Sequence, residues 1–455
     1  MRLYKVVLLG VLFASVGALA YAELQNVEVN GSIRIRGNWF DGSYDKSALD
    51  SAFVEQRTRL GVKADFTQDV HAFIEVDSYD IWGEDFRSQN YLTGADSRSR
   101  SVDDIEMFQA YIQAANIGGT GLTLTLGRQE LTLGSGWLVG NNTTSSFFTG
   151  LSFDMIRLTY AYEDSFRVDA FAAKLAESLR GFEEGDVDLY GVYATCTAIE
   201  NMAFDMYYMF LRDDGAVVGS AGANALLWAV RPGFIGHVAK IADVHTVGLR
   251  AAGSYEGFDF EAENAWQFGS VSDDSDRRFF EVFVDDGDLN FSVNAGLNLK
   301  AGYTFDVTTH PHPFAGFAAF MGLDEGKNKP NLAFNRLFSN WEYSEFLENT
   351  DLSNCYVWYT GLDLKPVDAL TVKAIGTVFM ADKNRNTDDA GGWELGVYAD
   401  YNYTDDLVFR AGVAHAWIDD SLRRGDRITN NGLFGFNSGK SSNLNYVFLE
   451  SELKF

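Results

Sequence analysis

Residues 54–66 read VEQRTRLGVKADF, and this stretch decides the fold class. From Leu60 onward every second residue is apolar, and the residues between are charged or glycine. Glu55, Arg57 and Arg59 continue the polar positions toward the start of the stretch. Because successive side chains of a β-strand point to opposite faces, this period of two predicts a strand with one apolar and one polar face.

The same alternation recurs along most of the chain, in segments separated by turns rich in Gly, Asp and Asn. It predicts about 18 strands, a number within the range of single-chain bacterial barrels. The predicted strands lie near residues 27–38, 53–66, 70–80, 104–116, 121–129, 154–162, 165–175, 187–197, 200–211, 244–254, 258–269, 291–303, 313–322, 355–365, 369–380, 393–403, 407–418 and 443–455.

Two folds share this pattern, since a soluble sandwich packs its apolar faces together while a membrane barrel turns them to lipid. The predicted strands are long for a sandwich, whose strands usually have about five to six residues. Aromatic residues gather near strand ends, as at Trp39-Phe40 and 160–162, where an interfacial girdle would place them. The chain also ends in an alternating strand on Phe455, which resembles the assembly signal of bacterial outer-membrane barrels. We therefore predict an all-β, transmembrane antiparallel β-barrel in the bacterial outer membrane.

Composition excludes several classes of protein. The 455 residues carry a formal net charge of −28, which argues against a nucleic-acid partner because such proteins need a basic face. Two cysteines are too few for a disulfide scaffold or a multi-cysteine metal module. Cys196 and Cys355 lie in predicted strands far apart in the chain, so free thiols are favoured over a bridge.

Residues 1–22 have the form of a secretory signal peptide. Arg2 and Lys5 precede an apolar run, and the small-x-small end Ala20-Tyr21-Ala22 predicts cleavage after Ala22. An uncleaved anchor is the alternative, but the apolar run is short for spanning a membrane. The expected domains are a signal peptide at 1–22 and one outer-membrane barrel at 23–455.

Signatures of enzymes and cofactors are weak in this sequence. His310-Pro-His312 has no third ligand nearby, and none of the common hydrolase or phosphate-loop motifs is present. We expect no catalytic residues, no metal and no cofactor. Acidic pairs recur in the predicted loops, and solvated loop surface is favoured for them over calcium binding or divalent bridging to lipopolysaccharide. These clusters are Glu183-Glu184-x-Asp186, Asp213-Asp214, Asp273-Asp274-x-Asp276, Asp285-Asp286-x-Asp288, Asp388-Asp389 and Asp419-Asp420.

The polar face of the predicted strands carries many basic residues. Two interpretations stay open: the cations and acids of a packed interior neutralise one another, or an arginine cluster selects anions. Arg128 falls on the apolar register of its strand, but it follows Gly127, where a bulge or the end of the strand could redirect it. The basic residues that alternation turns into the lumen include Arg34, Arg36, Arg57, Arg59, Arg157 and Arg250.

Several short motifs resemble the alginate export family of outer-membrane barrels, and they occur in order along nearly the whole mature chain. Each motif alone is weak. They are Gln56-Arg-Thr-Arg-Leu-Gly-Val, Leu126-Gly-Arg-Gln-Glu-Leu131, Gly136-Trp-Leu-Val-Gly140, Val247-Gly-Leu-Arg250, Glu263-Asn-Ala-Trp-Gln-Phe-Gly269, Ala301-Gly-Tyr-Thr-Phe305, Phe334-Asn-Arg-Leu-Phe338, Leu362-Asp-Leu-Lys-Pro366 and Gly392-Trp-Glu-Leu.

This resemblance implies a monomeric, 18-stranded barrel with an electropositive constriction that conducts an anionic polysaccharide outward. The segments 130–153 and 323–354 would gate the pore, and export partners would stand in the periplasm. Outer-membrane lipid and lipopolysaccharide would surround the wall. The family's pore arginines correspond to Arg57, Arg59, Arg128, Arg157 and Arg250 here, with Glu130 among the acids beside the path.

The sequence therefore predicts an outer-membrane channel, without enzymatic activity, for an alginate-like polysaccharide or small anionic solutes. Acids such as Glu261, Glu263 and Asp400 also face the predicted lumen and depart from a purely basic pore. A less selective porin for sugars or cations is one alternative. An outer-membrane enzyme or an adhesin with acidic loops is the other.

Overall fold

The computed structural model describes the chain from residue 24 onward, with gaps at the longer loops. The strands run antiparallel to their neighbours and are long enough to cross a bilayer when tilted. Its described residues are 24–41, 51–67, 69–82, 105–143, 148–177, 186–213, 239–273, 289–290, 293–322, 333–346, 353–382, 391–418 and 443–455. The strands are β1 (Asn26–Asp41), β2 (Ser51–Thr67), β3 (Val70–Ile81), β4 (Ile105–Ala114), β5 (Leu122–Gln129), β6 (Phe153–Tyr162), β7 (Phe166–Ala176), β8 (Val187–Cys196), β9 (Met202–Asp213), β10 (Ala239–Tyr255), β11 (Phe258–Asp273), β12 (Leu289–Asn290), β13 (Asn294–Tyr303), β14 (His312–Phe320), β15 (Cys355–Val367), β16 (Leu370–Ala381), β17 (Gly391–Asn402), β18 (Leu407–Ile418) and β19 (Asn443–Lys454).

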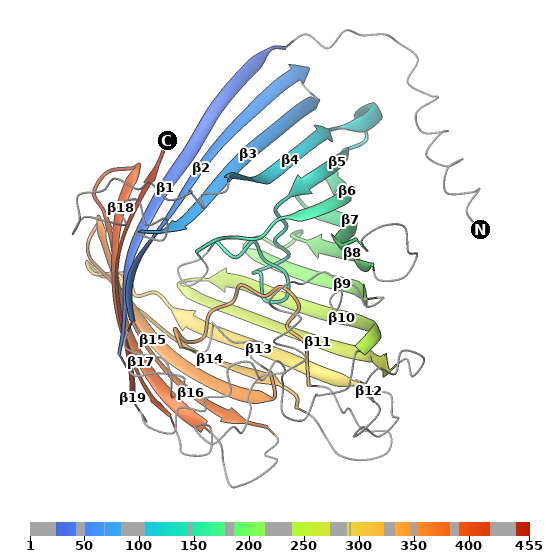
Figure 1. Cartoon of the computed structure of the whole chain (residues 1–455). Helices are drawn as coiled ribbons and strands as arrows, with labels where there is room; N and C mark the ends of the chain where they lie inside the picture. The colour runs from blue at the N-terminus through green and yellow to red at the C-terminus, as the bar shows by residue number, and fades with distance from the viewer. Residues whose placement is uncertain are drawn as a thin grey trace, which may run out of the picture.

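The strands form one closed sheet. Each strand pairs with its neighbours in chain order, and β19 pairs with β1 to close the wall (Figure 1). The short β12 and the longer β13 both lie along β11, so they occupy one place in the wall and the barrel has 18 strands. The predicted all-β barrel of about 18 strands is therefore confirmed. Most predicted boundaries fall within three residues of the observed ones, and the largest error is at the start of β10.

Alternation separates two faces of the wall. On β2, Arg57 and Arg59 point inward and are buried, while Leu60 and Val62 point outward and are 45% and 38% exposed. The other strands repeat this arrangement, with large apolar side chains exposed on the outer surface. Such an apolar outer band around a polar interior is typical of transmembrane barrels. Within the described residues, no helix has the length and apolar character needed to cross a membrane.

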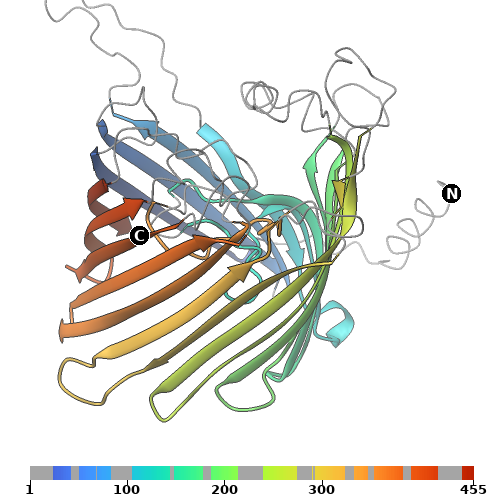
Figure 2. The same ribbon diagram turned by 90° about the horizontal axis from the view of Figure 1, so that it is seen from below.

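The two ends of the barrel differ in their connections. The turns that join β8 to β9, β10 to β11 and β13 to β14 are short and lie together at one end (Figure 2). Most connections at the other end are longer, and several of them exceed 20 residues. In outer-membrane barrels short turns face the periplasm and long loops face outward. These are the short-turn end and the long-loop end of the barrel.

Two segments between strands, 130–143 and 333–346, lie inside the barrel (Figure 1). They are joined by a parallel bridge between Val139 and Phe338, whose backbone N–H donates to Leu138 O at 2.8 Å. Both belong to the predicted gating segments, 130–153 and 323–354. Their described residues form an inner layer packed against the wall.

The inner layer is held by aromatic packing. Trp137 stacks on Phe320 and Phe334, with ring centroids 6.0 and 6.1 Å apart, and its indole N–H donates to Tyr343 Oη at 2.9 Å. All four side chains are at most 1% exposed. This cluster fills part of the lumen.

Several predicted features fall outside the described residues. These are the signal peptide at 1–22, the external loops at 83–103 and 419–442, and most of those at 212–243 and 270–290. Most of the acidic clusters belong to the same undescribed loops. Asp186 is described, at the start of β8.

Candidate functional site

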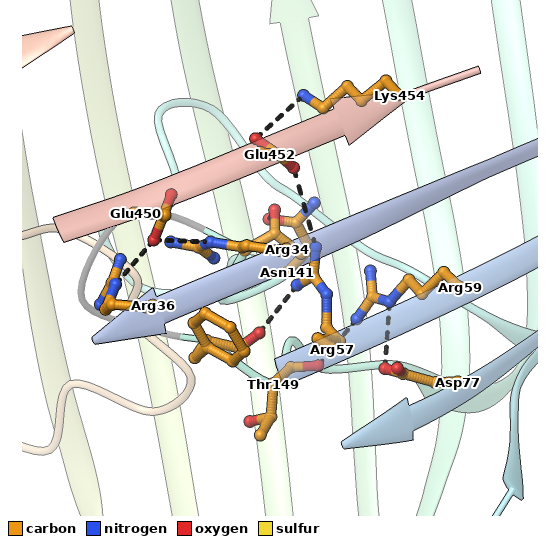
Figure 3. A network of polar contacts seen from close by, with 12 residues as sticks. Arg34, Arg36, Arg57, Arg59, Asp77, Asn141, Thr149, Glu450, Glu452 and Lys454 are labelled. Carbon is orange, nitrogen blue, oxygen red and sulfur yellow. Dashed lines mark hydrogen bonds and ion pairs between the residues drawn. The ribbon is translucent and has the colours of Figure 1, made fainter. Parts of the chain in front are cut away.

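Strands β1 and β2 carry four arginines on the inner face of the wall. Arg34 and Arg36 lie on β1, Arg57 and Arg59 lie on β2, and each is between 2% and 6% exposed. The strand register sets Arg34 directly opposite Arg57. Because cross-strand neighbours on one face have Cβ atoms about 5 Å apart, four guanidinium groups gather in one region, the arginine cluster (Figure 3).

Glu450 on β19 compensates part of this charge. Arg36 Nε lies 2.6 Å from the carboxylate and Arg34 Nε lies 3.0 Å away. A third cation, Arg410 on β18, contacts the same group at 2.6 Å. Glu450 therefore contacts three guanidinium groups at once, and Arg410 shares these contacts with Glu452, at 2.9 Å, and Asp400, at 3.9 Å.

Arg57 is the least compensated member of the cluster. Within the described residues its one ion pair is to Glu452, at 4.0 Å, and Glu452 contacts Arg410 more closely, at 2.9 Å. The Nε atom of Arg57 is buried and has no hydrogen-bond partner in the described part of the chain. A buried charge without a close counter-ion is costly, so this guanidinium is well placed to attract an anion.

Arg59 has closer partners. Its Nε lies 3.0 Å from Asp77 on β3, and its Nη1 lies 3.8 Å from Glu130. The guanidinium carbon also sits 3.5 Å from the ring centroid of Phe108, a cation–π contact. Burial raises the pKa of Glu130, which follows β5 and faces the cavity.

Residues 148–150, at the end of the connection between β5 and β6, form a strap over the arginine cluster. The Phe148 ring lies 4.6, 5.4 and 5.9 Å from the guanidinium carbons of Arg34, Arg36 and Arg57. Arg57 Nη1 also donates to the Phe148 carbonyl at 2.8 Å. One aromatic side chain therefore covers three of the four cations.

The strap also forms a hydrogen bond with Arg59, the fourth arginine of the cluster. Arg59 Nη2 donates to the Thr149 carbonyl at 2.7 Å (Figure 3). Gly150 has φ +82°, and a Cβ there would lie 2.4 Å from Arg59 Nη2. Glycine is therefore required for the strap to pass so close to the arginine.

The arginine cluster borders a cavity of about 800 Å³ in the lumen. Its walls carry both signs of charge. The cations on its lining are Arg34, Arg57, Arg59, Lys373, Arg410 and Lys454. The acids are Glu75, Glu130, Glu342, Glu345, Asp363, Asp400 and Glu452. The arginines and Glu452 lie on β1, β2, β18 and β19, whereas Glu342 and Glu345 come from the inner layer.

The inner layer is anchored beside the cavity by Glu394 on β17. This carboxylate accepts hydrogen bonds from the Ser344 hydroxyl and from the backbone N–H groups of Glu345, at 2.9 Å, and Phe346, at 3.2 Å. Burial, together with the neighbouring Glu342 and Glu394, raises the pKa of Glu345 to about 8. The Glu345 carboxyl is therefore mostly uncharged at neutral pH.

The arginines that were predicted to line the pore lie in different parts of the barrel. Arg34, Arg36, Arg57 and Arg59 come together with Glu130, as described above. Arg157 also points inward, but it pairs with Asp169 at 2.9 Å, outside the cavity. Arg250 points inward as well, and three carboxylates surround it on the wall formed by β9, β10 and β11.

Arg128 lies on the outer face of the wall, which corrects its prediction as a pore residue. Its strand keeps a continuous register with β4 and β6, so the expected bulge at Gly127 does not occur. The side chain is 42% exposed and pairs with Asp154 directly opposite, at 2.7 and 2.8 Å. Thr125 and Gln129, on the alternate positions of β5, are the buried ones.

Strand alternation cannot predict the side-chain directions of some residues of the site. Phe148, Tyr343 and Ser344 belong to connections, where side-chain direction follows no fixed period. Gly150 beside Phe148 and the aromatic residues around Tyr343 are the signals in the sequence that point to close packing there. Glu394 lies in a strand, and its alternation with Leu395 and Val397 predicts its inward direction.

The described residues contain no group of three or more His, Cys, Asp or Glu side chains arranged to hold a metal ion. His312 contacts Asp259 at 2.7 Å and Asp363 at 3.3 Å. Cys196 and Cys355 are both free thiols, as expected.

Comparison with solved structures supports the fold. Over 94% of this chain and 98% of the other, Pseudomonas aeruginosa OccK8 (OprE) superposes with a TM-score of 0.57 at 12% identity. Acinetobacter baumannii OccAB3 gives a TM-score of 0.58 at 11% identity, covering 94% of this chain and all of the other (100%). Identities this low show a shared fold alone. None of the curated proteins matches the sequence.

A sequence profile described as alginate export matches residues 26–390, most of the described barrel. The match spans the arginine cluster on β1 and β2, the strap and the inner layer, while β17 to β19 lie beyond it. Together with the barrel fold, this match identifies a transport channel and not an enzyme. The chain belongs to the alginate export family, and it is a channel of the bacterial outer membrane.

Proposed function

We propose that this channel passes anionic solutes, either an alginate-like polysaccharide or smaller carboxylates, along the arginine cluster. The observation that carries the proposal is Arg57, a buried guanidinium at the cavity whose one described ion pair is 4.0 Å long. Arg34 and Arg36 lie beside it and both contact Glu450. An anion entering the cavity would supply the missing negative charge, and rings of arginine and lysine favour anions in pores.

The acids of the cavity limit the strength of this preference. Glu342 and Glu345 stand on the inner layer, so an anion would move along the β1–β2 side of the cavity and away from them. Glu345 is mostly neutral at pH 7, since its pKa is raised to about 8, and this reduces the repulsion. We therefore expect a moderate selectivity for anions, which suits passage better than tight binding does.

A less selective porin for sugars is the second candidate. The balance of cations and acids on the cavity lining favours it, because a mixed lining gives neither ion a strong advantage. Such a pore would show a reversal potential near zero in a salt gradient. Neutral and acidic oligosaccharides of equal length would then interrupt its current equally.

Planar-bilayer conductance in a KCl gradient tests the proposal. The intact channel should favour chloride, and Arg57→Gln with Arg59→Gln should lower the chloride-to-potassium permeability ratio by about threefold or more, the Boltzmann factor for one charge about 5 Å away in water. Arg157→Gln is the matched control, since it removes an inward arginine outside the cavity. Oligouronates should block the intact channel more than neutral glucans do. A preference for potassium in the intact protein would overturn the proposal.

The proposal extends to the chain as it matures and to its surroundings. We propose that residues 1–22 are removed during export and that the remaining chain forms a single barrel domain that works as a monomer. Periplasmic export partners would deliver a polymer to the short-turn end. N-terminal sequencing of the purified protein checks the cleavage after Ala22, and its mass in a detergent micelle checks the monomer.

A further inference from the structure

The outer face of the wall carries a row of charged residues at the long-loop end of six neighbouring strands. The strand register places each residue directly opposite the next, so the row crosses from β5 to β10 without interruption. Its members are Arg128, Asp154, Lys174, Asp188, Arg212 and Asp243, and their charges alternate in sign. We call this set the charged row.

Every member points away from the lumen. Phe153 and Met155, which flank Asp154, are 2% and 3% exposed and face inward. Leu189 on β8 and Met209 on β9 likewise belong to the inner core. Because side chains alternate between faces, the charged residues beside them face outward.

The contacts within the row leave its charges accessible. Arg128 and Asp154 form a bidentate pair, and their side chains are 42% and 51% exposed. Lys174 contacts Asp188 at 2.8 Å and Asp186 at 2.9 Å, and it is 39% exposed. Both signs of charge can therefore reach a ligand on the outer surface.

An aromatic row lies beside the charged row on β8, β9 and β10 and continues onto β11. Two residues closer to the middle of the wall, Tyr190, Phe210, His245 and Phe268 are paired in register on adjacent strands. Their rings stack with centroids 6.2, 4.5 and 5.1 Å apart. Aromatic rings mark the edge of the hydrocarbon layer in membrane barrels, so the charged row lies at the level of the lipid head groups.

The charged row occupies one sector of the barrel. At the same end of β15, β17 and β18, the outward positions carry Trp358, Trp393 and Trp417, and the last two stack with centroids 3.5 Å apart. Long-loop ends face the outer leaflet, where lipopolysaccharide carries phosphates that divalent cations cross-link. Arginine and lysine bind phosphate directly, and aspartates bind Mg²⁺ or Ca²⁺ that a phosphate can share. A row with both signs therefore complements this head group better than a row with one sign.

We propose that the charged row is a docking site for the phosphorylated head group of lipopolysaccharide, with divalent cations bridging the lipid to its aspartates. The surface lies on the outside of the wall, so this inference is independent of which solute passes through the pore. On this proposal, the outer face of β5–β10 binds ordered lipid, whereas the outer face of β15–β18 contacts the bilayer through its aromatic residues.

Lipid binding to the purified, delipidated full chain tests the proposal. Native mass spectrometry with added lipopolysaccharide and Mg²⁺ would compare the wild type with Arg128→Gln, Lys174→Gln and Arg212→Gln combined. We expect the triple variant to bind about a hundredfold more weakly, as loss of three basic contacts at an anionic surface predicts. Removing Mg²⁺ with a chelator should weaken binding by the wild type as well.

Two controls keep the result interpretable. Lys63→Gln is the control for the loss of a lysine charge as such, since Lys63 is also 39% exposed and paired with acids, but it faces the lumen near the short-turn end. It should bind like the wild type. Arg128→Lys with Arg212→Lys retains both charges and should keep most of the affinity. Heat-modifiable migration on gels verifies that each variant is folded.

Three results would overturn the docking site: equal binding by the triple variant and the wild type, an equal loss in Lys63→Gln, or equally tight binding of phosphatidylglycerol by the wild type. The last result would assign the row to anionic phospholipid in general. Because the readout is bound lipid and not ion flux, a failure of the anion-channel proposal would leave these measurements unaffected.

Discussion

Arg57 and Arg250 are both inward-facing arginines of the same barrel, yet their surroundings differ in almost every respect. Arg57 borders the cavity and has one described ion pair, at 4.0 Å. Arg250 contacts Asp205 at 2.7 Å, Glu261 at 2.8 Å and Glu263 at 3.9 Å, and it does not border that cavity. Two inward-facing arginines of one barrel therefore differ in how closely carboxylates surround them and in whether they border the cavity.

The inner layer explains part of this difference. Gly134 has φ +57°, and a Cβ there would lie 3.1 Å from Arg250 Cδ and 2.5 Å from Tyr193 Oη. The inner layer thus passes directly over Arg250 and separates it from the cavity, whereas the strap at Phe148 leaves Arg57 at its border. Asp205 and Glu261 contact Arg250 closely and Glu263 lies slightly farther away, so the position is suited to a structural ion-pair network.

The largest expected effect of this difference is on folding stability. Arg250→Met should lower the free energy of unfolding by about 3–5 kcal/mol, because three carboxylates would lose their shared cation in a buried position. Arg57→Met should cost much less, since it removes a poorly compensated charge. Urea unfolding in lipid vesicles, followed by tryptophan fluorescence, measures both values. Equal losses of unfolding free energy in the two variants would contradict the proposed difference between the two arginines.

Strand alternation predicts the faces of the barrel well, because one polar and one apolar face per strand is what a closed wall between lipid and water requires. Arg34, Arg36, Arg57 and Arg59 could be assigned inward from the sequence for this reason. Strand alternation also predicts the direction of Arg128, which lies on the outer face. Its apolar register predicts an outward direction, and the family correspondence that assigned it to the pore is wrong for this chain.

The sequence predicts less about which inward arginines share a cavity. That depends on contacts between residues far apart in the chain, such as Glu450 with Arg36, and on how the connections fold into the lumen. The positions of Phe148 and Tyr343 have no periodic signal, because neither residue lies in a strand. The position of the inner layer depends on packing between aromatic side chains that come together only in the closed barrel.

The strap offers a sharper test of the arginine cluster. Phe148→Ala should raise the single-channel conductance by up to about twofold, because it removes a ring that stacks on three guanidinium groups and leaves those charges more exposed to solutes. Preference for chloride should increase at the same time. Phe40→Ala is the matched control, since it removes an aromatic ring that stacks on Tyr446 without covering an arginine. An unchanged conductance in Phe148→Ala would contradict a role for the strap in the permeation path.

The smallest expected effect concerns Glu345 and pH. Because its pKa is raised to about 8, the Glu345 carboxyl is neutral below that pH and adds a negative charge to the cavity above it. Chloride preference should therefore fall as pH rises from about 6.5 to 9, by less than about twofold, because Glu345 is one of seven acids on the cavity lining. Reversal potentials at each pH measure the change.

Two variants identify the titrating group. Glu345→Gln should make the preference for chloride independent of pH over this range, because the titrating carboxyl is absent. Glu342→Gln should shift the transition to lower pH, since it removes a neighbouring negative charge that raises the pKa of Glu345. The same direction applies to packing of the inner layer, which is most favourable while Glu345 is neutral and weakens as it ionises beside Glu342 and Glu394. A pH response that survives in Glu345→Gln would assign the effect to another group and leave the acidic side of the cavity without a role in selectivity.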